Sequence, residues 1–305
     1  MKRRFSTLDV FTTTRFGGNP LAVVLDAEGL DTATMLAIAA EFNYSETTFV
    51  LPPKDPANTA EVRIFTPKRE VPFAGHPNVG TAFLLASEGW PTIADAPGVY
   101  RFEEKAGLVP VSIAQRPDGA PASAELTAPE ALARQSGLVS REDVAACLSL
   151  PAEAILVDRH GPEVVSVGLP FLVVEIAGRA ALAAARPDTA VFARHLPVGG
   201  AVAIYLYTRD VPADEPGLDL QARMFSPLFG INEDPATGSA TAAAGALQAE
   251  LAGARPGETV VRVGQGFDMG RPSRLNVRVV RRDDGAASVH VGGACVRVMD
   301  GTLEA

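Results

Sequence analysis

The chain has 305 residues, which is enough for roughly two domains with sizeable cores. Its 47% hydrophobic and 21% charged residues are typical of an ordinary globular protein. The net charge is −9 and no basic block is present, so the composition argues against nucleic-acid binding.

The N-terminal segment predicts no leader peptide. Basic residues at positions 2–4 are followed by no apolar run, so we expect no signal peptide. The apolar stretch Val164–Ile176 is interrupted by Pro170 and is too short to span a bilayer. Cys147 and Cys295 belong to no Cys/His cluster, which is typical of buried thiols in a reduced, cytoplasmic protein.

The first half alternates short strand patterns with helix patterns. Asp31 is an N-cap candidate for a helix over Thr32–Glu41, whose apolar residues recur at helical spacing. Pro77 suits the first turn of a second helix that runs to about Glu88. Strands are predicted at Phe5–Phe11, Leu21–Leu25, Glu46–Leu51 and Val62–Phe65.

Two of the predicted helices are apolar nearly all round. The helix after Pro77 carries few polar residues, and a later one, Ser239–Leu251, is almost pure alanine. Such helices are normally buried inside a wrapping sheet rather than lying on its surface. We therefore expect both helices to be buried.

A Pro/Ala/Gly-rich stretch at residues 116–129 is the candidate linker between the halves. It suggests an N-terminal lobe over 1–118 and a C-terminal lobe over 119–305, with the last strands free to pack back towards the first lobe. In the second half a helix is predicted around Arg141–Leu148. Strands are predicted at Ala154–Val157, Val164–Val167, Leu172–Ile176, Val202–Thr208, Val277–Val280, Ala287–Val291 and Ala294–Met299.

One motif occurs twice in the chain. Residues 63–67 and 223–227 both read Arg-x-Phe-[Thr/Ser]-Pro, and both lead through a Pro/Gly-rich turn into one of the apolar helices. The offset of 160 residues is about half the chain, so a strand–turn–helix unit is used in two similar lobes. Helix N-termini present free backbone N–H groups, so two of them at one cleft would favour an anion such as a carboxylate.

Glu46 is the first candidate for chemistry, because it begins a strand of otherwise apolar and β-branched residues. It is either a solvated residue at a strand edge or a carboxylate in an apolar cleft acting as a general acid–base. The repeat offset pairs position 46 with Leu206, so only one lobe carries a carboxylate. One-sided placement favours an isomerase over an epimerase, which usually needs a base on each face.

The turns before the two apolar helices supply the other candidates. His76 lies at one predicted helix start, where a histidine is either a structural hydrogen-bonding group or a ligand contact. Asp234 lies in the matching turn, either as a helix N-cap or as a group that holds the substrate. Gly75 and Gly238 would let substrate atoms approach the backbone closely.

Cofactor and metal sites are not predicted. Residues 264–270 resemble a dinucleotide-binding fingerprint, but the spacing is wrong and no apolar helix follows. The histidines at 160, 195 and 290 are scattered, without metal-ligand spacing. We therefore expect no cofactor and no metal.

Taken together, these segments resemble the PhzF family, the phenazine-biosynthesis-like proteins with the diaminopimelate epimerase-like fold. The resemblance covers nearly the whole chain, in the family's order. The matching segments are Asp9–Val24, Asn43–Val50, Ile64–Ala82, Arg223–Ala240 and Gln265–Ser273.

The resemblance implies an α+β fold of two pseudo-symmetric lobes. Each lobe is a curved, mostly antiparallel sheet or barrel around a central buried helix, with the active site between the lobes. It also implies a homodimer that acts without a cofactor on a small carboxylate. Composition, cysteine usage and the short apolar stretches predict a cytoplasmic protein with no nucleic-acid or membrane partner. Lys68 departs from the family's usual pattern.

The resemblance carries roles over to individual residues. Glu46 matches the glutamate that moves a proton within a dihydro-hydroxyanthranilate, supported by His76 and Asp234 as further catalytic residues. The related epimerases keep a cysteine pair as opposed bases, whereas Cys147 and Cys295 lie outside both turns. Five residues of the two turns are expected to bind substrate: Gly75, Pro77, Thr237, Gly238 and Ser239.

Three functions stay open at this point. The first is a PhzF-like isomerase with Glu46 as its single base. The second is a cofactor-independent epimerase or dehydratase of an amino or hydroxy acid, with Asp234 or His76 as the second base. The third is a non-catalytic member that binds a metabolite or a protein.

Overall fold

The computed structural model describes residues 1–253 and 255–305. Contacts divide the chain into two compact units. The first unit contains Met1–Thr127 and Gly292–Ala305, and the second contains Ala128–Val291. Within the described ranges, no helix is long and apolar enough to cross a membrane.

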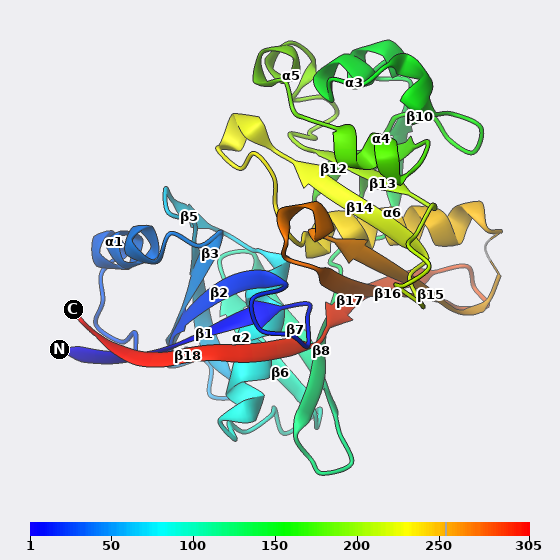
Figure 1. Cartoon of the computed structure of the whole chain (residues 1–305). Helices are drawn as coiled ribbons and strands as arrows, with labels where there is room; N and C mark the ends of the chain where they lie inside the picture. The colour runs from blue at the N-terminus through cyan, green and yellow to red at the C-terminus, as the bar shows by residue number, and fades with distance from the viewer. Residues whose placement is uncertain (254) are drawn as a thin grey trace. The chain divides into compact units, whose positions relative to one another are not determined.

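The first unit is a curved sheet around one central helix (Figure 1). Helix α2 (Gly75–Ser87) contacts strands β1, β2, β3, β7, β8 and β18, so the sheet surrounds it. A second helix, α1 (Thr32–Phe42), packs on β3 and β4. The strands are β1 Lys2–Val10, β2 Asn19–Val24, β3 Glu46–Leu51, β4 Ala60–Phe65, β5 Glu70–Val71, β6 Val99–Glu104, β7 Gly107–Gln115, β8 Pro121–Thr127 and β18 Cys295–Glu304.

The second unit repeats this plan around helix α6 (Gly238–Leu251), which contacts β11, β12, β15 and β16. Its strands are β9 Ala133–Ser136, β10 Ile155–Leu156, β11 Glu163–Ser166, β12 Pro170–Ile176, β13 Ile204–Thr208, β14 Leu220–Phe225, β15 Gly257–Gln265 and β16 Ser273–Arg281, and β17 Ala287–Gly293 leads back to the first unit. Its other helical segments are α3 Arg141–Cys147, α4 Arg179–Ala184, α5 Thr189–His195, η1 Ala152–Ala154, η2 Pro227–Phe229 and η3 Phe267–Met269.

The two units share one pairing order. In the first unit, β1–β2 is antiparallel, β2–β3 parallel, β3–β4 antiparallel, β4–β6 parallel and β6–β7 antiparallel. The series β11–β12–β13–β14–β15–β16 has the same directions in the same order. Both central helices follow the fourth strand of their series. The prediction of an α+β fold with two similar lobes is confirmed.

The predicted helices are largely confirmed. Asp31 caps α1, because its Oδ1 accepts from the backbone N–H of Thr34 at 2.7 Å. Both apolar helices are buried along most of their length. Helices α4 and α5 were not predicted, because each has only six or seven residues and shows little periodicity.

The prediction of a linker at residues 116–129 is wrong. Strand β8 lies within that stretch and pairs with β7, burying Ala124 and Leu126. The hairpin loop is short and contains Pro117, Asp118 and Gly119, the last with φ +84°. The predicted lobe boundary at 118/119 falls in this hairpin, whereas the compact unit runs to Thr127 because β8 stays paired with β7.

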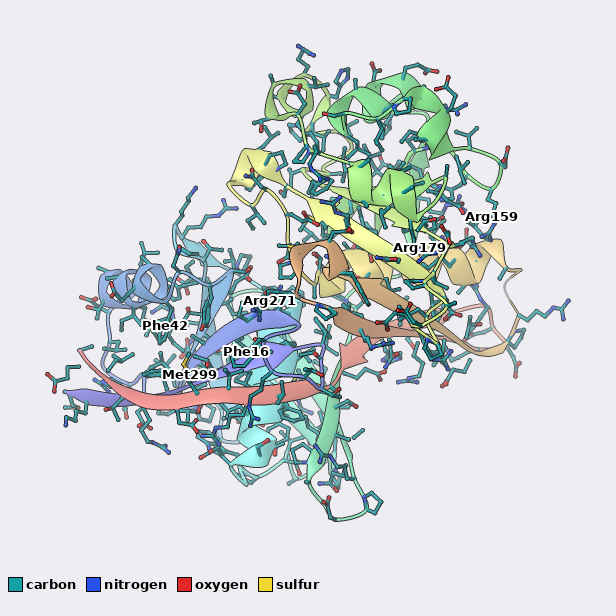
Figure 2. The ribbon with its side chains drawn as sticks, in the orientation of Figure 1. Phe16, Phe42, Arg159, Arg179, Arg271 and Met299 are labelled. Carbon is teal, nitrogen blue, oxygen red and sulfur yellow. The ribbon has the colours of Figure 1, made fainter. Side chains whose placement is uncertain are left out.

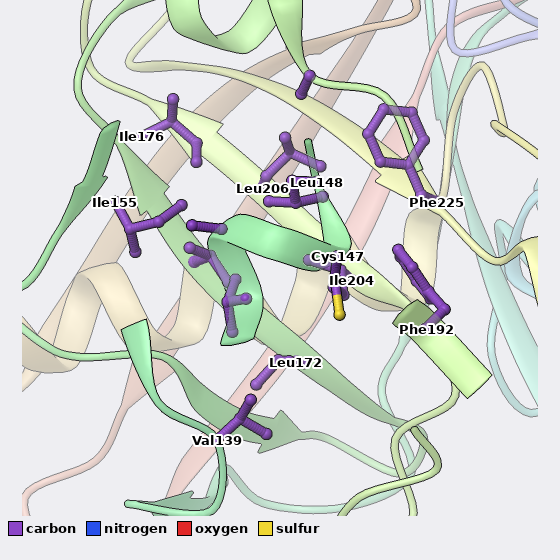
Figure 3. Close-up of a cluster of buried hydrophobic side chains, with 14 of the residues drawn as sticks. Val139, Cys147, Leu148, Ile155, Leu172, Ile176, Phe192, Ile204, Leu206 and Phe225 are labelled. Carbon is purple, nitrogen blue, oxygen red and sulfur yellow. The ribbon is translucent and has the colours of Figure 1, made fainter. Parts of the chain in front are cut away.

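The core of the second unit contains Leu206, which the repeat offset had paired with Glu46. Figure 3 shows Leu206 among buried side chains that include Phe225, Ile204 and Leu148. Leu206 has no exposed surface. It is therefore a packing residue.

One glycine in each central helix allows close packing against a strand. A Cβ on Gly245 of α6 would lie 2.7 Å from Cβ of Val277, whereas one on Gly80 of α2 would lie 2.5 Å from Cδ2 of Leu21. A Cβ on Gly80 would also lie 2.7 Å from Cγ2 of Val10, but both contacts of Gly80 are with terminal methyl groups that can rotate away, whereas the branched Cβ of Val277 moves only with its backbone.

We therefore expect Gly245→Ala to cost about 1–3 kcal/mol of stability, and more than Gly80→Ala. Without the contact, alanine would stabilise a helix by about 1 kcal/mol relative to glycine. Urea unfolding of the two variants tests this comparison. A larger loss in Gly80→Ala would contradict the packing argument.

Candidate active site

The structure brings two of the predicted catalytic residues together in the first unit. Glu46 is the first residue of β3, and His76 is the second residue of α2. Oε2 of Glu46 lies 3.6 Å from Nδ1 of His76. Their side chains are only 15% and 6% exposed. Glu46 is therefore a carboxylate in a largely buried setting, rather than a solvated group at a strand edge.

Burial keeps His76 uncharged. It lowers the pKa of His76 to about 3, and a hydrogen bond with the Pro20 backbone opposes the shift only partly. Nε2 of His76 is buried and has no hydrogen-bond partner among the described residues. A neutral imidazole cannot form an ion pair with Glu46, so it faces Glu46 as a hydrogen-bonding group rather than as a charge.

The loop before Pro20 has a constrained backbone. Phe16, labelled in Figure 2, has φ +72° and is 71% exposed. Its backbone N–H donates to Oδ2 of Asp9 at 2.6 Å. Asp9 thus holds in place the loop that leads to the contact with His76.

The first turn of α2 presents backbone donors. Its N-cap residue is Ala74, and no side chain of the described residues caps it. Gly75 and His76 occupy the first two helical positions, and Pro77 has no N–H to offer. Gly75 and Pro77 are both buried. Uncapped N–H groups at a helix start are suited to an anion.

In the second unit, the turn before α6 carries Asp234. Its Oδ2 accepts from Oγ1 of Thr237 at 2.5 Å, and Asp234 is 8% exposed. Helix α6 begins at Gly238 with Thr237 as its N-cap residue, so Asp234 does not cap the helix. Ser239 is half-buried in the first turn.

Two residues that position this turn were not predicted. Gln265 accepts from the backbone N–H of Thr237 at 3.1 Å and donates to the backbone carbonyl of Asp234 at 2.8 Å. Ser273 donates to the carbonyl of Pro235 at 3.1 Å. Both side chains are fully buried. Gln265 and Ser273 are the first and last residues of the segment that resembles the family. That resemblance was the one feature of the sequence that could have suggested a role for them beside Asp234.

The residue that occupies the place of Glu46 in the second unit is not Leu206. Arg63 and Arg223, the first residues of the repeat, pair across their sheets with Phe49 and Leu206. Leu206 therefore corresponds to Phe49, and Ala203 corresponds to Glu46. The linear offset fails here because the loop 209–219 is three residues longer than the loop 52–59. The asymmetry itself holds, since Ala203 carries no carboxylate.

The repeated motif forms the same clamp twice. Arg63 donates to both carboxyl oxygens of Glu70, each at 2.8 Å, and Arg223 donates to those of Glu233 at 2.7 and 2.8 Å. Each guanidinium lies over the phenyl ring two residues later. The clamps tie the end of β4 and of β14 to the segments that lead to His76 and Asp234.

The second clamp borders a cavity of about 530 Å³ within the second unit. Nη1 of Arg223 donates to the carbonyls of Leu182, Ala183 and Ala185, and Nε lies 3.9 Å from Oδ2 of Asp268, so the protein itself holds the guanidinium in place. The cavity is lined by Arg186, Pro187, Thr189, Arg223, Phe225, Asn232, Glu233 and Asp268.

The two cysteines and Lys68 take no part in the candidate site. Cys147 and Cys295 are buried free thiols, and burial raises their pKa values to about 11 and about 12. Lys68 is exposed on a turn. No group of three or more His, Cys, Asp or Glu side chains among residues 1–253 and 255–305 could hold a metal ion.

Comparison with known proteins identifies relatives along the whole chain. Residues 8–301 match the PhzC-PhzF family model, described as phenazine biosynthesis-like protein. The chain is 38% identical to an uncharacterized isomerase of Mesorhizobium japonicum, covering 99% of this chain and 98% of that protein. It is 34% identical to trans-2,3-dihydro-3-hydroxyanthranilate isomerase of Pseudomonas aeruginosa, covering 95% of each.

A solved structure gives the same result for the fold. The PhzF-family protein of Bacillus anthracis superposes with a TM-score of 0.89 at 25% identity, covering 100% of both chains.

Proposed function

The chain belongs to the PhzC-PhzF family of phenazine biosynthesis-like proteins and is an isomerase, and we propose that it moves a proton within a small carboxylate. In this proposal Glu46 is the single general acid–base. It removes a proton from an activated carbon and returns it to another carbon on the same face of the substrate.

The observation that carries the proposal is the pairing of Glu46 with a neutral His76. A neutral imidazole does not hold Glu46 permanently ionised, as a cation would, so the carboxyl group can both take up and release a proton. His76 then orients a polar group of the substrate or relays a proton. A proton moved by one group stays on one face, which suits an isomerisation.

The remaining site residues have binding roles in the proposal. The N–H groups at the start of α2, beginning with Gly75, bind the substrate carboxylate and the charge that develops on it. Pro77 shapes that turn. Asp234, Thr237, Gly238 and Ser239 hold further polar groups of the substrate, with Asp234 kept in place by Thr237 and Gln265. A homodimer belongs to the same proposal and rests on the family resemblance.

Isotope transfer tests the reaction type. The protein is incubated in deuterated water with trans-2,3-dihydro-3-hydroxyanthranilate and with cyclic and amino-acid carboxylates, and each C–H position is followed by NMR. We expect loss of a proton at one carbon and gain at a second carbon of the same molecule. Exchange with inversion at a single carbon would instead favour an epimerase, with Asp234 or His76 as its second base.

A further inference from the structure

Glu104 is a half-buried residue of the first unit with an unusual carboxyl group. It is the last residue of β6, and its carboxyl group lies beside the amide side chain of Asn78 in α2. Both carboxyl oxygens are buried, and neither has a hydrogen-bond partner in the described part of the chain. Oδ1 of Asn78 is likewise buried without a partner there. An ionised carboxylate in this position would be strongly disfavoured.

The charged groups near Glu104 are engaged elsewhere. On the neighbouring strand β4, Arg63 pairs with Glu70 and Glu61 pairs with Lys54. Lys105, the next residue, pairs with Glu70 at 2.6 Å. Strand β7 on the other side has no charged residue, and the nearby helix start contributes only the neutral His76. Burial therefore dominates and raises the pKa of Glu104 to about 8, although Asn78 acts in the opposite direction.

Asn78 connects Glu104 to the start of α2. Its Nδ2 donates to the carbonyl of Ala74 at 3.0 Å, which spans the turn that carries Gly75 and His76. This orientation of the amide leaves Oδ1 as an acceptor without a donor. A protonated carboxyl group has one O–H to donate. One proton on Glu104 would thus satisfy both unpartnered groups.

We propose that Glu104 is a neutral carboxylic acid whose O–H donates to Oδ1 of Asn78 and thereby positions the first turn of α2. Glu104 is then a positioning residue for His76. Its effect on catalysis rests on the proposed function, whereas its protonation does not. When the pH rises far enough to remove this proton, a buried negative charge appears beside Asn78 and the turn loosens.

The pH dependence follows from proton linkage. A free glutamate has a pKa near 4.3, so the folded chain binds a proton on Glu104 that the unfolded chain has already released at neutral pH. Stability should therefore fall as the pH rises from about 5 to about 8, and level off above that range. Glu104→Gln is neutral at every pH and should lack this component.

The direct test is a titration of the wild-type protein by ¹³C NMR of glutamate carboxyl carbons. The signal missing in Glu104→Gln identifies Glu104, and we expect its midpoint near pH 8. Thermal unfolding should show Tm of Glu104→Gln rising relative to wild type between pH 5 and pH 8. Glu41→Gln, at an exposed position of α1, is the matched control. Its Tm should differ from that of wild type by the same amount at every pH between 5 and 8. A Glu104 midpoint near 4.3, or a Tm difference independent of pH, would overturn the proposal.

Amide exchange and turnover test whether Glu104 positions the first turn of α2. Above pH 8 the amides of residues 75–79 should exchange faster in wild type than in Glu104→Gln, once both are corrected for intrinsic exchange. With an active substrate, kcat of wild type should fall above pH 8 while that of Glu104→Gln stays level. Equal amide protection in the two proteins above pH 8 would refute the positioning role. If no substrate turns over, the proposed function fails, but the titration and exchange results still decide the role of Glu104.

Discussion

Replacing Glu46 with Gln is expected to lower turnover of an active substrate by about 10²–10⁴-fold, because that is the usual contribution of a positioned general acid–base. Glutamine keeps the size of the side chain and its place beside His76 but cannot take up a proton. Unfolding by urea should change little, since glutamine has nearly the same size as glutamate and Glu46 is only the first residue of β3. Deuterium exchange into the substrate, followed by NMR, is the most direct measurement.

Glu41→Gln serves as the control for this experiment as well, because Glu41 is exposed on α1. It should retain wild-type turnover and exchange. If Glu46→Gln turned over at the wild-type rate, the single-base mechanism would be wrong. If it lost turnover together with its fold, circular dichroism would reveal the loss, and Glu46→Asp would then show whether the carboxylate itself is needed.

Glu233→Gln is expected to cause the largest loss of stability, about 3–5 kcal/mol, because it removes the bidentate counter-charge of the buried Arg223 guanidinium and leaves the more distant Asp268, at 3.9 Å. The side chain of Arg223 is only 5% exposed, and that of Arg63 in the equivalent clamp is 19% exposed. Glu70→Gln should therefore cost less, since water can reach Arg63 more easily. Urea unfolding of both variants measures the difference.

The two clamps can be compared because they share the same motif and the same bidentate geometry, with Glu70 also pairing with the exposed Lys105. An equal cost for the two variants would show that burial of the arginine does not set the energy. Glu233 directly precedes Asp234, so Glu233→Gln should also disturb the turn held by Gln265. Slower amide exchange at residues 236–240 than in wild type would contradict that expectation.

Much of the fold could be predicted from the sequence because its signals are local or repeated. Helix α1 has a capping residue and apolar residues at helical spacing. The apolar composition of the other two helices indicates that they are buried. The repeated Arg-x-Phe motif predicted two similar lobes, and the pairing order agrees. Strand β8 was missed because its small residues resemble those of a loop, although pairing with β7 makes it a strand.

The candidate site could be predicted only in part. His76 and Glu46 were found because each stands out in its local pattern, and the structure adds that they are 3.6 Å apart. Gln265 and Glu104 were not assigned roles, because a buried polar residue in a strand pattern has no local signature. The pairing of Glu46 with Leu206 was wrong because an offset along the chain ignores a difference in loop length, which strand register reveals.

The two-lobed α+β plan, the two buried helices and the candidate proton-transfer residues could all be predicted from the amino-acid sequence. These follow from periodicity, composition and side-chain chemistry, which are properties of neighbouring residues. The ionisation of those residues depends instead on how the folded chain packs around them. His76 is neutral and Glu104 is held as an acid because distant segments exclude water from them, and desolvation depends on what packs around a group rather than on what adjoins it in the chain.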